Sequence, residues 1–353
     1  MAFDFDLLRR LSETPGIAGQ EDQVRSLVAA EMRPLVDEIS IDALGNVIGR
    51  KRGSATNATQ RRVMISAHMD EIGFIVRYVD DDGFLRLNPV GGFDPRVLFA
   101  QRVIVHASVG EPLRGVLSTA GKPIHLLDRE DIKNAKIDDY FVDTGLPGDR
   151  VKALVEIGDM VTLDRTAHRV GELVIGKAMD DRVGVFVMIE ALRRVGNHEV
   201  DIVAVASVQE EVGLRGAGTS AFAVEPDVGI ALDVTLAVDI PGVGKEAAVT
   251  RLGAGAAIGV MNSSVISNTK LVRHFREIAR REKIAYQMEI MPRGGTDAGA
   301  IQRARGGVAA LTLSVPTRYV HTVNEMVHPA DVEACADLLA RYLEEAHTRG
   351  YEF

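Results

Sequence analysis

Two patterns of hydrophobic spacing alternate along this sequence, and their order constrains the fold more than any other feature. Before residue 72 and after residue 164, apolar residues follow helical spacing or form short apolar runs. Between these points they tend to alternate with polar residues, as in Phe74-Ile-Val76 and Arg102-Val-Ile-Val-His106, with turn signals at Asp81-Asp-Gly83 and Val109-Gly110. We therefore expect an all-β insertion (residues 72–164) within a discontinuous α/β domain (residues 1–71 and 165–353).

The flanking regions alternate helices with strands. We expect helices at residues 4–11, 21–36, 182–194, 271–283 and near the C-terminus, strands at residues 63–67, 200–208, 228–232, 285–291 and 308–315, and a hairpin around residues 42–46. This alternation predicts a mainly parallel sheet covered by helices on both faces. A length of 353 residues suits about two domains of ordinary size.

Composition narrows the class of protein. The net charge is -9 with both signs interspersed, which does not suit a nucleic-acid partner. No apolar run reaches about 18 residues, and the N-terminal residues lack the pattern of a secretory signal, so we expect a cytoplasmic protein that does not bind membranes. The chain has no tryptophan and few aromatic residues, which argues against an extended sugar-binding platform.

The only cysteine, Cys335, is expected to be a core residue. It shares helical spacing with Val332, Leu338, Leu339 and Tyr342, and free cysteine packs as a small hydrophobic residue. A single cysteine also excludes a disulfide within the chain and a thiolate-rich zinc site. Any metal must therefore be held by histidine, aspartate and glutamate.

Adjacent carboxylates end the apolar run that begins at Val203. Glu210 and Glu211 follow this run and precede a glycine-rich turn. Burying two carboxylates requires a compensating charge. A metal-dependent hydrolase has a use for both, since one acid can hold the cation while the other moves protons.

Other acids and histidines follow further predicted strands. They are His68 and Asp70, Asp180 and Asp181, Asp233, and His321. Functional residues of such sheets gather outside the carboxyl ends of the strands, so these residues could surround one pocket. A single histidine near a strand end is more often hydrogen-bonded within the protein or exposed at the surface than bound to a metal. The whole set is difficult to explain as an ion network, because carboxylates without matching cations repel one another and protonate.

Spacing suggests a division of roles. In His-x-Asp, the carboxylate of Asp70 can orient the imidazole, so we expect Asp70 to support the site and not to bind metal. Neighbouring side chains on extended backbone point to opposite sides. In the pairs Asp180-Asp181 and Glu210-Glu211, one member should therefore face the metals and the other should differ in role.

The segment Arg293-Gly-Gly-Thr-Asp-Ala298 leaves two interpretations open. It could be a glycine turn followed by a helix that is capped by Thr296 or Asp297. Alternatively, the backbone at Gly295 approaches the substrate, because glycine allows such closeness.

These motifs together resemble the family of tetrahedral and glutamyl aminopeptidases. The motifs are Ala67-His-Met-Asp-Glu-Ile-Gly73, Gly176-Lys-Ala-Met-Asp-Asp-Arg-Val-Gly184, Gln209-Glu-Glu-Val-Gly-Leu-Arg-Gly-Ala217, Gly294-Gly-Thr-Asp-Ala298 and Pro316-Thr-Arg-Tyr-Val-His321. The resemblance covers nearly the whole chain. It implies an enzyme that removes N-terminal amino acids from short peptides, with two divalent metal ions per subunit, zinc first and cobalt or manganese as alternatives. It also implies that the inserted all-β domain is barrel-like and makes the contacts of homodimers, which build a hollow dodecamer.

The resemblance also implies a role for each site residue. His68 and Asp233 would bind one metal, Glu211 and His321 the other, and Asp180 both, while Glu210 would act as general base on a metal-bridged hydroxide. The remaining residues would support the site or contact substrate: Asp70, Asp181, Gly295, Thr296 and Asp297.

Two segments depart from the family's usual form. Lys122-Pro-Ile-His-Leu126 stands where Lys-Pro-Pro-His is usual, and His125 and His106 are expected to be scaffold or surface residues. Thr322-Val-Asn-Glu325 stands where Ser-Pro-Val-Glu is commoner, which leaves His321 in place but puts the local loop shape in question.

Two other functions compete with peptide hydrolysis. Paired carboxylates also serve glycoside hydrolysis, and relatives of this family have been labelled endoglucanases. The histidines and the missing tryptophan argue against that function. A non-catalytic metal-binding assembly protein is the other alternative, and the base beside a full ligand set argues against it.

Overall fold

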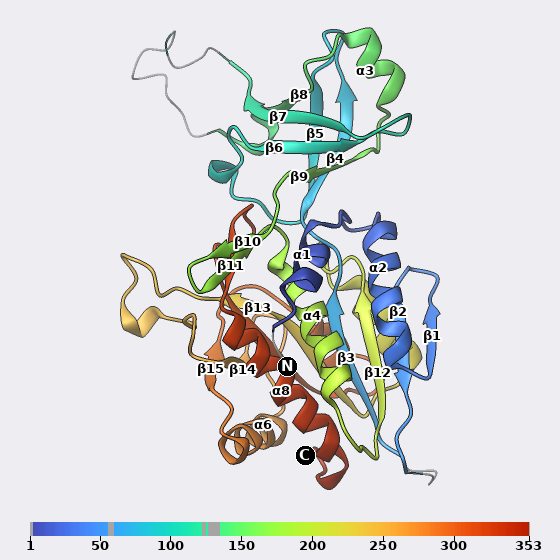
Figure 1. Ribbon diagram of the computed structural model, residues 1–353, viewed down its shortest axis with the longest axis vertical. Helices are drawn as coiled ribbons and strands as arrows, with labels where there is room; N and C mark the ends of the chain where they lie inside the picture. Colours follow the sequence, from blue (N-terminus) through green and yellow to red (C-terminus); the bar gives the residue numbers. More distant parts are fainter. Residues whose placement is uncertain (1–2, 56–59, 122–124, 126–134, 353) are drawn as a thin grey trace.

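The chain folds into a helix-covered sheet from which a β-barrel projects. The computed structural model describes residues 3–55, 60–121, 125 and 135–352. In Figure 1 the barrel lies at the top, and the α/β part, which holds both ends of the chain, lies below. This is the predicted fold class, an α/β domain with an inserted all-β barrel.

The α/β part is built on one mixed sheet. Its order is β1-β2-β12-β3-β13-β16-β17-β11-β10, and β14 joins β16 and β15 to complete eleven strands within the described residues. The bounds are β1 Glu38–Ile41, β2 Val47–Lys51, β3 Arg62–His68, β10 His168–Val170, β11 Leu173–Gly176, β12 Asp201–Ser207, β13 Val228–Leu236, β14 Ala256–Met261, β15 Tyr286–Ile290, β16 Ala309–Arg318 and β17 Glu325–Val327. The neighbours β12, β3, β13 and β16 are parallel, as predicted, whereas the flanking strands β1, β2, β10, β11 and β17 pair antiparallel.

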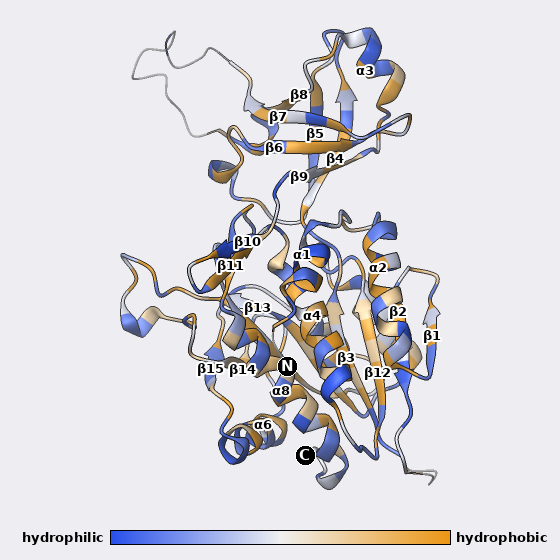
Figure 2. Ribbon diagram, viewed as in Figure 1, coloured by the Kyte–Doolittle hydropathy of each residue, from blue (hydrophilic) through white to orange (hydrophobic). Residues whose placement is uncertain are grey.

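Helices cover both faces of this sheet. Their bounds are α1 Phe5–Glu13, α2 Asp22–Met32, α4 Met179–Arg194, α5 Arg215–Val224, α6 Thr269–Glu282, α7 Asp297–Gln302 and α8 Pro329–Glu345, and α3 Gly148–Leu154 belongs to the barrel region. Val63 and Ile65 of β3 pack into the core beneath α1, α4 and α8, while Met64 points to the opposite layer with α5 and α7. In Figure 2, hydrophobic residues run along the central strands, and hydrophilic residues lie on outer turns of α6 and α3.

Two predicted helices differ from the observed ones at their ends. Residues 21–36 were predicted as one helix, but α2 ends at Met32 and a 3-10 turn, Arg33–Leu35, follows. Pro34 accounts for this, because proline lacks the amide hydrogen that a continuing helix needs. Helix α4 begins at Met179, and Asp180 and Asp181 at its start have non-helical backbone angles.

The inserted barrel is closed by antiparallel pairing. Its order is β4-β5-β8-β7-β6-β9, with bounds β4 Gly73–Val79, β5 Leu85–Val90, β6 Arg102–His106, β7 Leu113–Thr119, β8 Tyr140–Asp143 and β9 Met160–Leu163. Its interior is a separate hydrophobic cluster that includes Phe74, Val103 and Val161. Gly83 and Gly110 have φ of 93° and 84°, so the predicted turns use glycine where other residues would be strained.

Other residues singled out by the sequence have scaffold positions. Cys335 is fully buried in the α/β core, as predicted. His106 lies on β6 with its ring 2.9 Å from the Thr162 hydroxyl, and His125 is exposed. The rest of the predicted motif at residues 122–126 lies outside the described residues. No helix in the described part of the chain has the length and hydropathy needed to cross a membrane.

Candidate metal centre

A pocket of about 530 Å³ lies beside the carboxyl ends of the parallel strands. Its lining includes all six residues that the sequence assigned to metal binding and proton transfer: His68, Asp180, Glu210, Glu211, Asp233 and His321. His68 ends β3, the two glutamates follow β12, Asp233 lies on β13, and His321 follows β16. The parallel core thus brings together residues that are up to 253 positions apart, from 68 to 321.

Asp180 stands between two groups of possible ligands. Its Oδ1 lies 3.0 Å from His68 Nε2, and its Oδ2 lies 3.3 Å from His321 Nε2. Donor atoms of His68, Asp180 and Asp233 all lie within 4.8 Å of one another, and so do those of Asp180, Glu211 and His321. One carboxylate is therefore placed to serve two cation positions.

Glu210 and Glu211 both face the pocket. Glu211 Oε1 lies 3.3 Å from His321 Nε2, and Glu210 Oε2 lies 3.8 Å from His68 Nε2. The expectation that neighbouring side chains would point to opposite sides was wrong for this pair. The backbone is not extended here, because the amides of Gly213 and Leu214 donate to the Glu210 carbonyl and close a turn.

Asp70 supports this turn through its carboxylate. The Asp70 oxygens accept the backbone N–H groups of Glu210 and Glu211 at 3.0 and 3.1 Å. The nearer partner of the His68 ring is the Asp70 backbone carbonyl, which accepts from Nδ1 at 3.0 Å, whereas the carboxylate lies 3.5 Å away. Since a carbonyl can only accept, Nδ1 carries the proton and Nε2 points to the pocket. Asp70 thus orients one imidazole and two glutamates.

The side chains of Asp180 and Asp181 occupy different positions, and the peptide bond between the two residues is cis. Asp180 lines the pocket, whereas Asp181 is fully buried behind it. Asp181 accepts the backbone N–H groups of His68 and Gly184 at 3.2 and 3.0 Å. A Cβ at Gly184 would lie 2.2 Å from Asp181 Oδ1, so only glycine allows this close approach.

The loop before α7 brings its glycines to the pocket and its threonine to the start of the helix. Gly294 and Gly295 line the pocket. Thr296 is the N-cap of α7, but its side chain makes no capping bond, and its hydroxyl lies 2.8 Å from that of Thr312. Asp297 is buried behind the pocket, where its Oδ2 accepts the hydroxyls of Ser66 and Ser207 at 2.7 and 2.6 Å.

The electrostatics of the pocket are dominated by negative charge. Burial raises the pKa of Glu210, Glu211 and Asp233 above their usual values, and neighbouring carboxylates raise them further. Burial also opposes ionisation of Asp180, but its contacts with His321 and His68 lower its pKa. Contacts with Asp180 and Glu211 outweigh burial and raise the pKa of His321 to about 12. The two histidines cannot neutralise all these acids.

The donor set fits divalent cations. Glu211 Oε1 is buried and has no hydrogen-bond partner among the described residues, although His321 Nε2 lies 3.3 Å away. A buried carboxylate oxygen without a donor is costly unless a cation or an ordered water satisfies it. The candidate ligand atoms are imidazole nitrogens and carboxylate oxygens, which suit zinc, cobalt or manganese.

Three features of the site were not assigned a role from the sequence. Glu325 is buried behind the pocket, and burial raises its pKa to about 8. Arg293 is the only basic side chain other than histidine in the pocket lining. A Cβ at Gly92 of the barrel segment would lie 3.5 Å from His321 Nδ1, so the barrel reaches the site. In the sequence, the adjacent glycines Gly91 and Gly92 could have indicated this close approach of the barrel segment to His321.

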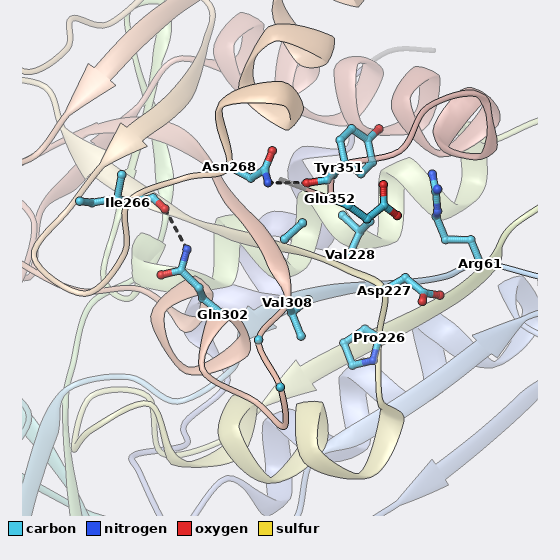
Figure 3. Close-up of a pocket in the computed structure, with 13 residues that line it drawn as sticks. Arg61, Pro226, Asp227, Val228, Ile266, Asn268, Gln302, Val308, Tyr351 and Glu352 are labelled. Carbon is cyan, nitrogen blue, oxygen red and sulfur yellow. Dashed lines mark hydrogen bonds between the residues drawn. The ribbon is translucent and has the colours of Figure 1, made fainter.

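A larger cavity of about 730 Å³ lies at the other end of the sheet. Figure 3 shows Arg61, Asp227, Asn268, Gln302 and Tyr351 around it, at the amino ends of β3, β13 and β16. Its lining contains no histidine, and none of the possible metal groups found among the described residues lies there. A choice by cavity volume alone would therefore select this cavity, although it holds none of the candidate metal ligands.

An α/β fold with an inserted barrel and a shared-carboxylate His/Asp/Glu cluster at the strand ends defines a class, the metal-dependent exopeptidases. The sequence pattern of the M42 glutamyl aminopeptidase family matches residues 45–338, and the chain belongs to this family.

Individual relatives agree with this assignment. The lysyl aminopeptidase of Pyrococcus furiosus is 39% identical over 354 residues, covering 97% of each chain. An aminopeptidase structure from Desulfurococcus kamchatkensis has a TM-score of 0.91 and 39% identity, covering 96% of this chain and 94% of that one. The TET1 peptidase of Pyrococcus horikoshii, which can assemble into a tetrahedron or a large octahedral shell, has a TM-score of 0.85 and 31% identity, covering 96% and 99%.

Proposed function

We propose that this aminopeptidase works with two divalent metal ions, of which Asp180 binds both. His68 and Asp233 complete one site, and Glu211 and His321 complete the other. The observation that carries the proposal is the membership of Asp180 in two separate groups of converging donor atoms. Its two oxygens face different histidines, at 3.0 and 3.3 Å, as a bridging carboxylate requires.

Zinc is the first candidate for both sites, and cobalt and manganese are alternatives. The proposed ligands are only imidazoles and carboxylates, and zinc accepts such sets at three-protein-ligand catalytic sites. Cobalt accepts similar donors, and manganese tolerates oxygen-rich sites.

Glu210 is the proposed general base. A bound pair of divalent ions makes water acidic enough to attack at neutral pH and polarises the scissile carbonyl. Glu210 lines the pocket and converges with His68 and Glu211, but it belongs to neither of the two groups that share Asp180. It would take a proton from the attacking water and return it to the leaving amine. Burial raises the pKa of Glu210, which moves this carboxylate toward the proton affinity that a base needs near neutrality.

The proposed substrates are short peptides with a free N-terminus. Arg293, Gly294 and Gly295 line the pocket, and we propose that their N–H groups bind the peptide backbone. Leu214, Leu236 and Val320 offer apolar surface on the lining. The family description names glutamyl substrates and the Pyrococcus furiosus relative lysyl ones, so both residues belong in a substrate panel.

We also propose an assembly of dimers into a dodecamer in the cytoplasm. A Pyrococcus horikoshii TET1 structure contains a dodecamer, and this chain is 31% identical to it over 96% of its length. In this proposal, residues 72–164 form the domain that makes dimer contacts. Light scattering that finds a stable monomer would contradict it.

A chelation experiment tests the function. Enzyme stripped of metal and then restored with zinc, cobalt or manganese is assayed on aminoacyl anilides, including glutamyl, lysyl and leucyl, on an N-acetylated peptide and on soluble cellulose. We expect activity only on free N-termini, lost on stripping and recovered with metal. Hydrolysis of the blocked peptide or of cellulose, or activity that persists without metal, would refute the proposal. A folded, metal-loaded protein without any activity would favour the assembly-protein alternative.

A further inference from the structure

One buried carboxylate holds the backbone of two proposed metal ligands at once. Glu325 Oε2 accepts the backbone N–H of Asp180 at 3.0 Å, and Glu325 Oε1 accepts that of His321 at 2.7 Å. Asp180 is 145 residues away in sequence, whereas His321 is only four residues away. The two oxygens of a single side chain therefore connect the loop after β11 with the loop after β16.

Both backbone segments need such a partner. The angles of Asp180 are non-helical (φ -74°, ψ 107°) although it lies in the first turn of α4, where amide hydrogens have no partner within the helix. His321 has a φ of 62°, in the left-handed region that costs a residue other than glycine roughly 1 kcal/mol or more. Such a conformation persists when its surroundings fix it, and the bond to Glu325 does so at the residue itself.

The position of Glu325 is itself fixed. It is the first residue of β17, pairs with Gly176 of β11, and is 2% exposed. No arginine or lysine forms an ion pair with it in the described part of the chain. A buried carboxylate without a cation requires strong donors, and the two amides are the hydrogen bonds that the structure provides for its oxygens.

We infer that Glu325 is a positioning residue of the metal centre, which sets the distance between Asp180 and His321 by holding both backbones. This inference rests on the proposed two-metal function. In that function Asp180 and His321 bind the same metal, so the distance of 3.3 Å between Asp180 Oδ2 and His321 Nε2 has to be maintained. Glu325 does not itself line the pocket, and it reaches the lining through the backbone N–H groups of Asp180 and His321. Its effect on activity is therefore transmitted through the two ligands.

Glu325→Gln is the principal test, because the amide keeps the shape and one acceptor but turns an N–H donor toward one of the two backbone amides. Metal affinity is measured by competition with a chromogenic chelator, and site geometry by the visible absorption of the cobalt-loaded enzyme. We expect metal affinity to fall about 10- to 100-fold at one site, since partners of metal ligands typically matter by that factor. The cobalt spectrum should change, and kcat should fall more than KM rises.

Glu289→Gln is the matched control. Glu289 is also buried, at 1% exposure, but its carboxylate accepts the Ser314 hydroxyl and touches no proposed ligand. This control should leave metal affinity and the cobalt spectrum unchanged. Glu325→Asp keeps the charge but is one methylene shorter, so it should hold one amide and give an intermediate affinity. It also carries the test if Glu325→Gln does not fold.

The outcomes separate this inference from the proposed function. A wild-type enzyme that binds two metals, together with Glu325 variants of unchanged affinity and spectrum, refutes the positioning role alone. Lower unfolding stability with intact metal binding also refutes it, because Glu325 would then be only structural. A wild-type enzyme that binds no divalent metal refutes the proposed function and the inference with it.

Discussion

The ammonium group of Lys177 contacts both carboxylate oxygens of Glu71, at 2.7 and 2.5 Å. Both side chains are buried. Glu71 directly follows Asp70, and Lys177 lies three residues before Asp180. Glu71 Oε1 also accepts the Gly16 N–H at 3.2 Å. This ion pair therefore joins the two loops behind the pocket to the N-terminal segment.

Breaking the pair from one side should destabilise the protein strongly. Glu71→Gln leaves the buried Lys177 charge without its carboxylate, so it should lower the free energy of unfolding by about 3 to 5 kcal/mol. Lys177→Met should cost less, because Arg182 Nη2 still lies 3.7 Å from Glu71 Oε1. The double variant should lose less than the sum, since the Lys177 charge is then no longer left behind. Urea unfolding of the metal-loaded protein measures these values. Additive losses in the double variant would show that the pair is not coupled.

The two neighbouring glutamates should fail in different ways. Glu210→Gln removes the proposed base but no proposed ligand, so kcat should fall roughly 10²- to 10⁴-fold with both metals retained. Glu211→Gln weakens a ligand of one metal, so it should lose that ion. Steady-state kinetics and elemental analysis of the dialysed proteins distinguish these results. Loss of a metal from Glu210→Gln, with both retained in Glu211→Gln, would mean that the two roles are exchanged.

A general rule of the fold accounts for five of the six pocket residues, and their individual roles came from the family resemblance. Asp180 is the exception, because it follows β11, which pairs antiparallel with β10 and β17. Residues at the carboxyl ends of parallel strands converge wherever the core of the sheet is parallel, and β3, β12, β13 and β16 form such a core. The longer helices were predicted from the helical spacing of their apolar residues, which is a local property of the sequence. No knowledge of loop conformation was needed for either result.

Details that depend on loop backbone could not be predicted. The orientation of Glu210 and Glu211 follows from a turn closed by Gly213 and Leu214, which no periodicity encodes. The bonds from Asp70 to that turn, and from Glu325 to Asp180 and His321, join backbone amides that any residue type would supply. Strand β14 and helix α5 were also missed. β14 is a short run, Ala256–Met261, and α5 contains Gly216 and Gly218, which weaken a helical pattern.

Removal of metal should lower stability as well as activity. The acids around Asp180 repel one another without cations, so the stripped protein should unfold at a lower temperature and recover on addition of zinc. With free metal at about 100 times its dissociation constant, the expected stabilisation is about 2.7 kcal/mol for each site. Differential scanning calorimetry measures the shift, and Glu210→Gln is a control that should keep it. An unchanged unfolding temperature on stripping would argue against metal binding at this cluster.

A single buried acid outside the pocket should produce a measurable pH dependence of stability. Glu289 lies on β15, is 1% exposed, and has its pKa raised by burial from 4.5 to about 7. Between these values the folded state keeps its proton while the unfolded chain has lost it. The unfolded state then binds fewer protons, so the free energy of unfolding falls as pH rises from about 4.5 to about 7. The loss is on the order of 3 kcal/mol, since one pKa unit corresponds to about 1.4 kcal/mol.

Glu289→Gln stays neutral and keeps an acceptor for Ser314. It should match the wild type near pH 4.5 and exceed its stability above pH 7, in urea titrations at fixed protein and metal concentration. Asp81→Asn is a suitable control, because Lys152 lowers the pKa of this exposed acid and so keeps its titration outside the window. Parallel pH profiles for wild type and Glu289→Gln would show that Glu289 ionises normally in the folded protein.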